Sequence, residues 1–364
     1  MKLTVTVNLN VRVGKASLNA PCYQYLAPGS ILEVDGNLYP GDKYDGISTW
    51  YKDLAGNYYW SGGVGVIEKR YTSENENLNV ILKPSWMSGN FDVSSFWPET
   101  TGKGITVAVI DSGIFPHEDL KDCIDYEHAK SFVGDTIEDT DGHGTHIAGI
   151  IAARGNSDLI GVAPDVKIVP IRVIKSSDSE LDSFLLTDAI NYASSLDHIQ
   201  IINISLATKN TSALKSSIDN AINKGKIVVA ASGNTSTDEM DFPAYYDNVI
   251  SVSSLERIAG IIERYVLLAD SSFGSRVKTC CIGKKITSCN NSPNGTKSMS
   301  GTSMATAFMS GLIALKIQNM ILNNAIINQS LILNKIISSV FDMVKCGEFN
   351  DRKLSIISIL KFLS

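Results

Sequence analysis

From residue 104 onward, short apolar runs alternate with stretches of helical period. The apolar runs are GITVAVI (104–110), VKIVPI (166–171), IQIINI (199–204) and KIVVAA (226–231), and the helical stretches cover 145–153, 181–196 and 212–224. Continuous apolar runs of this kind indicate strands that are buried on both faces of a sheet. Their alternation with helices predicts an α/β fold, in which a parallel sheet carries helices on both faces.

Polar residues follow these runs, where the carboxyl ends of parallel strands would meet at one edge of the sheet. Asp111 follows the first run, Ser205, Leu206 and Ala207 follow the third, and Asn234 follows the fourth. An aspartate or asparagine after a strand is by itself common turn chemistry. The pattern becomes informative only because the same edge would receive further reactive groups.

A histidine and a serine add those groups. His143 lies between Gly142 and Gly144 where a helix begins, and we expect these glycines to let the backbone approach a substrate closely. Ser303 opens another helical stretch, where unpartnered N–H groups and the helix dipole favour an anion, although serine is also a common N-cap. With Asp111 and an amide donor, these residues fill the roles of nucleophile, base, orienting carboxylate and oxyanion donor in acyl transfer.

Four motifs in this region resemble the signature blocks of the subtilisin-like serine proteases. In chain order they are VAVIDSGI, DGHGTHIAG, AASGN and GTSMAT, and the resemblance extends over about 90–320. It implies a subtilisin-like fold and a serine endopeptidase with Asp111, His143 and Ser303 as its catalytic residues. It also implies that Asn234 donates a hydrogen bond in the oxyanion hole and that His146 is structural.

The chain departs from the family pattern at three places. Ala307 stands where a proline usually follows the nucleophile, and Cys281-Ile282-Gly283 stands where Ala-Pro-Gly is usual. The substrate-binding strand reads Ser205-Leu206-Ala207 in place of Ser-Leu-Gly, so an additional methyl group would narrow the cleft. These changes predict a selective protease rather than a broad digestive enzyme.

Asp241 is a candidate for the selective residue. In EMDFPAYY it precedes the Phe-Pro pair that, in the family, follows the bottom of the first specificity pocket. A carboxylate there would favour Lys or Arg before the cut through a charge-assisted hydrogen bond. The alternative, a solvated acid among the other acids of the STDEMD loop, stays open.

Residues 1–70 have a different pattern, with apolar residues that alternate with polar ones and frequent turn signals. This predicts a small all-β barrel. The segments LNVRVGKASLNAP, LAPGSILEV and WYKDLAGNYYWSGGV resemble a bacterial SH3-type domain, which implies a peptide or a cell-wall peptide as ligand. The aromatic cluster around Trp50 and Trp60 is either that ligand groove or barrel core. A rival hypothesis for the whole chain is therefore a non-catalytic peptide- or cell-wall-binding protein.

The predicted organisation has three parts. The SH3-like barrel at 1–70 is followed by a linker at 71–89, where Asn, Ser and Glu dominate the first half. The protease domain occupies 90–364 and ends in one or two helices after residue 320. A short amphipathic tail, DRKLSIISILKFLS, is expected to face the core.

Composition excludes several classes of protein. The net charge is −6, and no basic block is present, which argues against nucleic-acid binding. No continuous run of apolar residues is long enough for a membrane span. The N-terminal residues lack the apolar core of a signal peptide, so we expect a cytoplasmic location, with export by another route left open.

The cysteines match no zinc pattern, because Cys280 and Cys281 are adjacent and Cys289 follows eight residues later. We expect reduced, buried thiols, while a 280–289 or 281–289 disulfide stays open for an exported protein. Calcium is common in the family that the motifs resemble, but we find no acidic ligand loop. We therefore expect neither a metal nor a cofactor.

Overall fold

The computed structural model describes most of the chain, in two compact units. The described residues are 2–5, 9–26, 30–66, 68–69, 80–81, 84, 86–87, 91–157, 159–176, 180–258, 264–343, 354–357 and 362–363. One unit comprises residues 1–83 with 259–264, and the other comprises residues 84–258 with 265–364. The predicted linker at 71–89 lies almost entirely outside the described residues.

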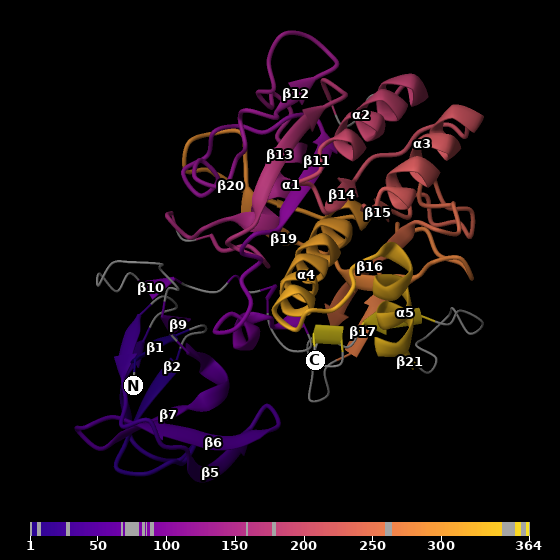
Figure 1. Ribbon diagram of the computed structural model, residues 1–364. Helices are drawn as coiled ribbons and strands as arrows, with labels where there is room; N and C mark the ends of the chain where they lie inside the picture. Colours follow the sequence, from indigo (N-terminus) through magenta and orange to yellow (C-terminus); the bar gives the residue numbers. More distant parts are fainter. Residues whose placement is uncertain are drawn as a thin grey trace. The chain divides into compact units, whose positions relative to one another are not determined.

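The larger unit is built on a ten-stranded, mostly parallel sheet (Figure 1). Its strands are β11 (Thr106–Asp111), β12 (Lys130–Ser131), β13 (Lys167–Arg172), β14 (Ile201–Ile204), β15 (Ile227–Ala231), β16 (Ile250–Ile258), β17 (Arg264–Leu267), β18 (Thr279–Ile282), β21 (Val340–Met343) and β22 (Leu354–Ile357). The order is β12-β13-β11-β14-β15-β16-β18-β22-β21, with β17 paired to β16. Only the last pair, β21 with β22, is antiparallel along this path.

Helices cover both faces of this sheet, as the sequence predicts. They are α1 (His143–Ala152), α2 (Ser183–Ser195), α3 (Ser212–Asn223), α4 (Thr302–Leu322) and α5 (Gln329–Ser339). Val107 and Val109 of β11 belong to one core cluster with residues of α1 and α4, whereas Ala108 and Ile110 belong to another with α2 and α3. This division follows from the two-residue period of a strand, which sends successive side chains to opposite faces.

The predicted elements between residues 104 and 231 are all present, with bounds that shift by at most two residues. The expected helices after residue 320 are present as the end of α4 and α5. The chain then returns to the sheet, because Cys280 of β18 pairs with Ile356 of β22. Of the predicted tail, the described residues Phe362 and Leu363 are buried, as expected for a core-facing segment. A short hairpin of β19 (Ile286–Cys289) and β20 (Thr296–Met299) precedes α4.

α4 is the central helix of the larger unit. Its length and composition would suffice for a membrane span, but residues 302–317 are all buried inside the protein. A Cβ atom on Gly311 would lie only 2.6 Å from Val162 Cβ, so the helix approaches its neighbours closely there. A helix that is apolar all round is typical of such an enclosed position.

The C-terminal part of α4 also holds the chain that leads into β11. Gln318 Oε1 accepts hydrogen bonds from the backbone N–H groups of Thr101 (2.8 Å), Gly102 (2.7 Å) and Lys103 (3.2 Å). One side-chain oxygen therefore accepts hydrogen bonds from three consecutive backbone N–H groups. This contact links the helix that begins near Ser303 to the strand that ends at Asp111.

The smaller unit consists of antiparallel strands. They are β1 (Lys2–Val5), β2 (Leu9–Val13), β3 (Cys22–Leu26), β4 (Ile31–Glu33), β5 (Tyr39–Tyr44), β6 (Ile47–Lys52), β7 (Asn57–Trp60), β8 (Val64–Val66), β9 (Glu68–Lys69) and β10 (Val80–Ile81). They form the sheets β3-β2-β7-β6-β5, β4-β1-β8 and β10-β9 around a core that includes Leu3, Val11 and Tyr59. The all-β prediction is confirmed, but the described pairings do not close these sheets into a barrel, and the SH3 resemblance stays a prediction.

The described cysteines of the larger unit favour the reduced state. Cys123, Cys281 and Cys289 are buried free thiols, so neither the 280–289 nor the 281–289 disulfide is present. Burial raises the pKa of Cys123 to about 12, and it raises the pKa of Cys281 well above its ordinary value. Thiols in this state are poor nucleophiles. Cys346 lies outside the described residues.

The Gln318 contact yields a stability prediction. We expect Gln318→Met to lower the free energy of unfolding by about 1–3 kcal/mol, because buried N–H groups lose their acceptor. Gln318→Glu keeps an acceptor oxygen and should cost clearly less. Chemical denaturation of both variants measures the difference. Equal losses for Met and Glu would contradict this role for the side-chain oxygen.

Candidate functional site

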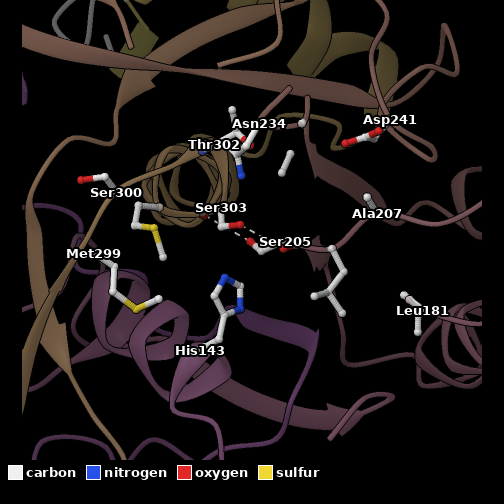
Figure 2. Close-up of a pocket in the computed structure, with 14 residues that line it drawn as sticks. His143, Leu181, Ser205, Ala207, Asn234, Asp241, Met299, Ser300, Thr302 and Ser303 are labelled. Carbon is white, nitrogen blue, oxygen red and sulfur yellow. Dashed lines mark hydrogen bonds between the residues drawn. The ribbon is translucent and has the colours of Figure 1, made fainter. Parts of the chain in front are cut away.

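A cavity of about 350 Å³ lies at the carboxyl ends of β14 and β15, beside the start of α4 (Figure 2). All of the predicted site residues line it except Asp111. Those residues are His143, Ser205, Leu206, Ala207, Asn234, Asp241 and Ser303. The structure therefore brings together side chains that are up to 160 positions apart in the sequence. This agrees with the rule that open parallel sheets place their sites at the carboxyl ends of strands.

Asp111 lies behind His143 and orients its ring. It is the last residue of β11 and is fully buried. Its Oδ1 accepts a hydrogen bond from His143 Nδ1 at 2.8 Å and another from the Ser112 N–H at 2.8 Å. Because a carboxylate only accepts, the proton of this contact belongs to Nδ1. The other ring nitrogen, Nε2, is then available as a base.

A second buried carboxylate, which the sequence analysis missed, fixes the start of α1. Asp139 accepts hydrogen bonds from the N–H groups of Gly142 (2.8 Å) and Thr145 (2.9 Å), and from the Thr145 hydroxyl (2.6 Å). The Ser112 hydroxyl donates to Asp139 (3.0 Å) and accepts from the Gly144 N–H (3.0 Å). This network ties the helix that carries His143 to the strand end that carries Asp111. An acid just before a helix start was the available signal.

Packing requires glycine at position 144. A Cβ atom there would collide with the Gly113 carbonyl oxygen and would lie 3.1 Å from Asp111 Cβ. The structure thus gives this glycine a packing role, and the expected approach to a substrate stays a prediction. Its missing side chain lets α1 approach the end of β11 closely enough for the hydrogen bond between Asp111 and His143.

Ser303 is the second residue of α4, and the imidazole of His143 points toward it in Figure 2. Its hydroxyl donates to the Ser205 carbonyl oxygen at 3.0 Å rather than to His143. The Ser205 hydroxyl in turn donates to the Ser303 carbonyl oxygen at 3.2 Å. A different χ1 rotamer re-aims a serine hydroxyl, and catalytic hydrogen bonds often tighten only when substrate is bound.

Asn234 is held by its oxygen. Its Oδ1 accepts hydrogen bonds from the Thr302 N–H (3.0 Å) and the Thr302 hydroxyl (3.1 Å), so its NH₂ group is left to serve the cavity. Gly301 precedes this contact with φ of 149°, and a Cβ atom there would lie 3.3 Å from both Asn234 side-chain polar atoms. Glycine is thus required both by the backbone conformation and by the space. Thr302 was not singled out from the sequence.

The two histidines of α1 differ in their pKa values. Burial alone would lower the pKa of His143, but the carboxylate of Asp111, supported by Asp141 and Asp139, raises it above its ordinary value of 6.5. Burial lowers the pKa of His146 to about 4. His146 Nε2 donates to the carbonyl oxygens of Ile286 and Lys297, both at 3.0 Å, and so fastens the hairpin of β19 and β20. These contacts agree with a structural role.

Asp241 and Ala207 lie on the wall of the cavity away from His143 (Figure 2). Asp241 Oδ2 packs against Gly233, where a Cβ atom would collide with it. Burial raises the pKa of Asp241. No described residue forms an ion pair or a side-chain hydrogen bond with this carboxylate. Asp241 is therefore a half-buried acid that faces the cavity without a protein cation beside it.

The N-terminal aromatic cluster contributes both to a buried core and to a pocket. Trp50 and Tyr59 are buried, with 2% and 4% of their surface exposed. Tyr44 and Trp60 make an edge-to-face contact at 4.9 Å and line a second pocket of about 540 Å³, together with Arg12. Trp50 lines this pocket as well, and whether the pocket is a ligand groove stays a prediction. The ligand of this pocket stays a prediction.

Comparison with known proteins gives one family and several relatives. The model of the subtilase family matches residues 102–343. The minor extracellular protease Epr of Bacillus subtilis (strain 168) is 35% identical over 248 residues, which cover 66% of this chain and 35% of that protein. The thermophilic serine proteinase of Bacillus sp. (strain AK1) is 36% identical over 227 residues, or 60% of this chain and 54% of the relative. The chain thus spans about a third to a half of these relatives.

Solved structures agree with the fold. Sphericase superimposes with a TM-score of 0.62 at 26% identity, and the matched region covers 73% of this chain and 96% of the sphericase chain. The prenylagaramide maturation protease PagA gives a TM-score of 0.65 at 24% identity and covers 75% of this chain and 97% of its own. Because PagA is only 24% identical to this chain, its similarity concerns the fold alone.

The charges around His143 yield a testable titration. We expect Asp111→Asn to lower the pKa of His143, because the carboxylate that stabilises the imidazolium is lost while burial remains. Asp141→Asn should lower it less, since its carboxylate contributes less. NMR titration can resolve these shifts, as the chain has five histidines. A His143 pKa that is unchanged in Asp111→Asn would contradict the coupling.

Proposed function

Because this chain belongs to the subtilase family, we propose that it is a serine endopeptidase whose catalytic residues are Asp111, His143 and Ser303. The observation that carries the proposal is the buried hydrogen bond of 2.8 Å between Asp111 and His143, beside a cavity that Ser303 and Asn234 also line. A peptide bond in that cavity would meet a hydroxyl, a base and a hydrogen-bond donor together.

In the first step, His143 Nε2 takes the proton of the Ser303 hydroxyl as its oxygen attacks the carbonyl carbon of the substrate. A serine hydroxyl is nearly inert at neutral pH without such a base. The Asn234 NH₂ group and the Ser303 N–H stabilise the negative oxygen of the tetrahedral intermediate. Asp111 stabilises the imidazolium and keeps its proton on Nδ1.

In the second step, the imidazolium gives the proton from Nε2 to the leaving amine, and the C–N bond breaks. The acyl group remains on Ser303 Oγ as an ester. A water molecule then gives its proton to His143 and attacks the ester carbonyl, and the collapse of that intermediate returns the proton to Ser303. The products are a free carboxylic acid and an amine, so the balance requires only water.

The rival function, a peptide-holding protein without catalysis, accounts less well for the same contacts. Simple peptide binding does not need a buried carboxylate that fixes the tautomer of a cavity histidine. Nor does it need an amide whose oxygen is held at 3.0 Å so that its NH₂ group serves the cavity. Burying the Asp111 carboxylate costs free energy, which catalysis would justify.

Substitution of the proposed nucleophile tests the activity. We expect Ser303→Ala to lose peptide hydrolysis by several orders of magnitude and to lose labelling by a fluorophosphonate probe. Asn234→Ala should keep the labelling site and lower kcat by about 10²–10³. In the unmodified protein, kcat/KM should rise with pH through a pKa above 6.5, since only neutral His143 can accept the proton.

The exposed Ser298, on β20, offers a matched control, because Ser298→Ala should leave rate and labelling unchanged. Full activity in Ser303→Ala, or an unlabelled unmodified protein that still binds peptides, would favour the rival function.

We further propose that Asp241 gives a preference for Lys or Arg before the cut. Its half-buried carboxylate on the cavity wall has no cation among the described residues, so a substrate cation would supply one. Burial raises the pKa of Asp241. The preference should therefore weaken as the pH falls through that pKa, because the carboxylate becomes protonated and loses its charge.

Paired peptide substrates test this specificity. We expect Asp241→Asn to lower kcat/KM for Arg before the cut by about tenfold or more, with little change for Phe or Leu. Asp238→Asn, in the exposed part of the same loop, is the control and should alter neither. An unmodified protein that prefers Phe or Leu would end the proposal for Asp241 while leaving the triad untouched.

A further inference from the structure

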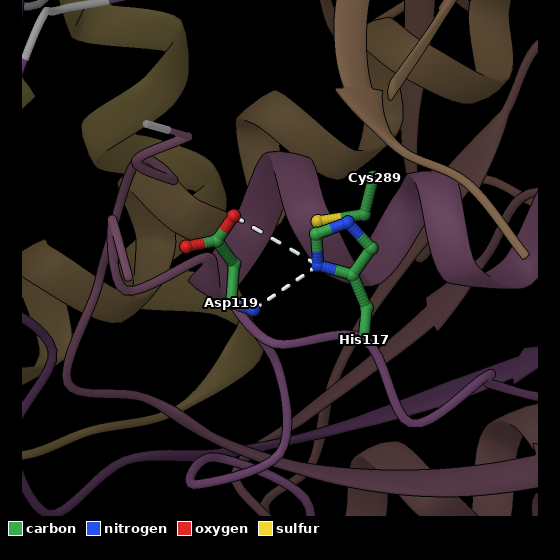
Figure 3. Close-up of side chains that lie close together, drawn as sticks. All are labelled: His117, Asp119 and Cys289. Carbon is green, nitrogen blue, oxygen red and sulfur yellow. Dashed lines mark hydrogen bonds and ion pairs between the residues drawn. The ribbon is translucent and has the colours of Figure 1, made fainter. Parts of the chain in front are cut away.

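Two clusters of metal-ligating side chains occur among the described residues. The first is His117, Asp119 and Cys289 (Figure 3). Its histidine is fully used, because Nδ1 accepts from the Asp119 N–H (3.0 Å) and Nε2 donates to the Gly295 carbonyl oxygen (2.9 Å). The Asp119 carboxylate accepts from the N–H and the hydroxyl of Ser157. Protein groups therefore already occupy the ring nitrogens of His117 and the carboxylate of Asp119, which leaves these atoms unavailable to a metal ion.

The second cluster, Asp125, His128 and His198, lies at the opposite edge of the sheet from the cavity. The Asp125 N–H donates to the carbonyl oxygen of Ile168, the second residue of β13. His198 lies three residues before the start of β14. Both strands are parallel, so this is the edge where they begin, whereas the cavity lies where they end.

The three ligand atoms of this cluster converge. Asp125 Oδ2 lies 2.9 Å from His128 Nδ1 and 3.3 Å from His198 Nε2. All three atoms lie within 4.8 Å of one another. In a tetrahedral zinc site, bond lengths of about 2.0–2.2 Å separate neighbouring ligand atoms by about 3.4 Å. The carboxylate oxygen therefore already lies close to the spacing that one ion requires from each of the two histidine nitrogens.

His198 carries the unexplained group of the cluster. Its Nε2 is buried and makes no hydrogen bond among the described residues, although it faces Asp125 Oδ2. Its ring is tilted by 53° against that of His128, with centroids 4.4 Å apart. A buried nitrogen that makes no hydrogen bond costs free energy, and a metal bond would remove that cost.

The surrounding contacts hold the ligands in place. The His128 N–H donates to Asp125 Oδ1 at 3.2 Å, which leaves Oδ2 directed at the histidines. The Tyr192 hydroxyl donates to the His128 carbonyl oxygen at 3.0 Å. Such outer contacts typically orient metal ligands. The side chains of Asp125, His128 and His198 are 20%, 33% and 39% exposed, so an ion can reach them from solvent.

We propose that Asp125, His128 and His198 form a binding site for a divalent transition-metal ion, best suited to Zn²⁺ with water as fourth ligand. Two imidazole nitrogens with one carboxylate suit zinc, whereas calcium and magnesium take oxygen ligands. The ion would join two loops that are about seventy residues apart and would act through stability, since the site lies away from the cavity. The rival is an ion pair of Asp125 with protonated His128 or His198, without metal.

Calorimetric titration of the metal-free, full-length Ser303→Ala protein with Zn²⁺ tests the site. We expect one bound ion, and at least about 100-fold weaker binding in both His128→Gln and His198→Gln. Cys289→Ser serves as the control and should bind as tightly as its parent. Zn²⁺ should also raise the unfolding temperature of the parent and not that of the two histidine variants.

Co²⁺ in place of Zn²⁺ reports the ligand types. We expect visible bands of a tetrahedral ion without a thiolate-to-metal charge-transfer band, since the site holds no sulfur. Absence of binding, binding that survives both histidine substitutions, or a thiolate band that disappears in Cys289→Ser would each overturn the proposal. None of these results depends on whether Ser303 is the nucleophile.

Discussion

The site depends on a carboxylate that is buried at the end of a central strand. Asp111 has no exposed surface, and a charge in that position is tolerable only because its partners are fixed. The Ser112 N–H and the His143 ring supply them, each at 2.8 Å. The ring can be there because Asp139 and Gly144 fix the first turn of α1 against β11. The contacts that make the burial of Asp111 tolerable are therefore the same contacts that position His143.

The same principle governs the other side of the cavity. Asn234 could turn either end of its amide toward a substrate, and Thr302 decides the choice by donating to Oδ1. Thr302 and Ser303 are neighbours at the start of α4, so one helix terminus presents the hydroxyl and selects the orientation of the amide donor. Gln318, near the other end of α4, holds the turn before β11. A single buried helix thus connects the two halves of the site.

The two edges of the sheet are suited to different tasks. At the carboxyl edge, side chains face a cavity that a peptide can enter. At the amino edge, Asp125, His128 and His198 converge on a point between two loops. None of these three residues lines the cavity, so they do not contact a substrate there.

The sequence by itself determined the parallel sheet with helices on both faces, and it located Asp111, His143, Asn234 and Ser303. Apolar runs and turn signals are local properties, so they can be read without knowing which segments meet. Asp241 is named only through the family resemblance of its loop, and its place on the cavity wall could not be derived from that loop alone.

Only the tertiary structure decided which distant groups touch. Three contacts illustrate this: Asp139 with the start of α1, Thr302 with Asn234, and Asp125 with His198. Each joins residues whose contact no periodic pattern in the sequence predicts. Gly144 shows most clearly what the sequence cannot reveal. Glycine is needed there because a Cβ atom would collide with the Gly113 carbonyl oxygen, which packing brings close. Local patterns fix which elements form, whereas contact distances and hydrogen-bond partners arise only when those elements pack.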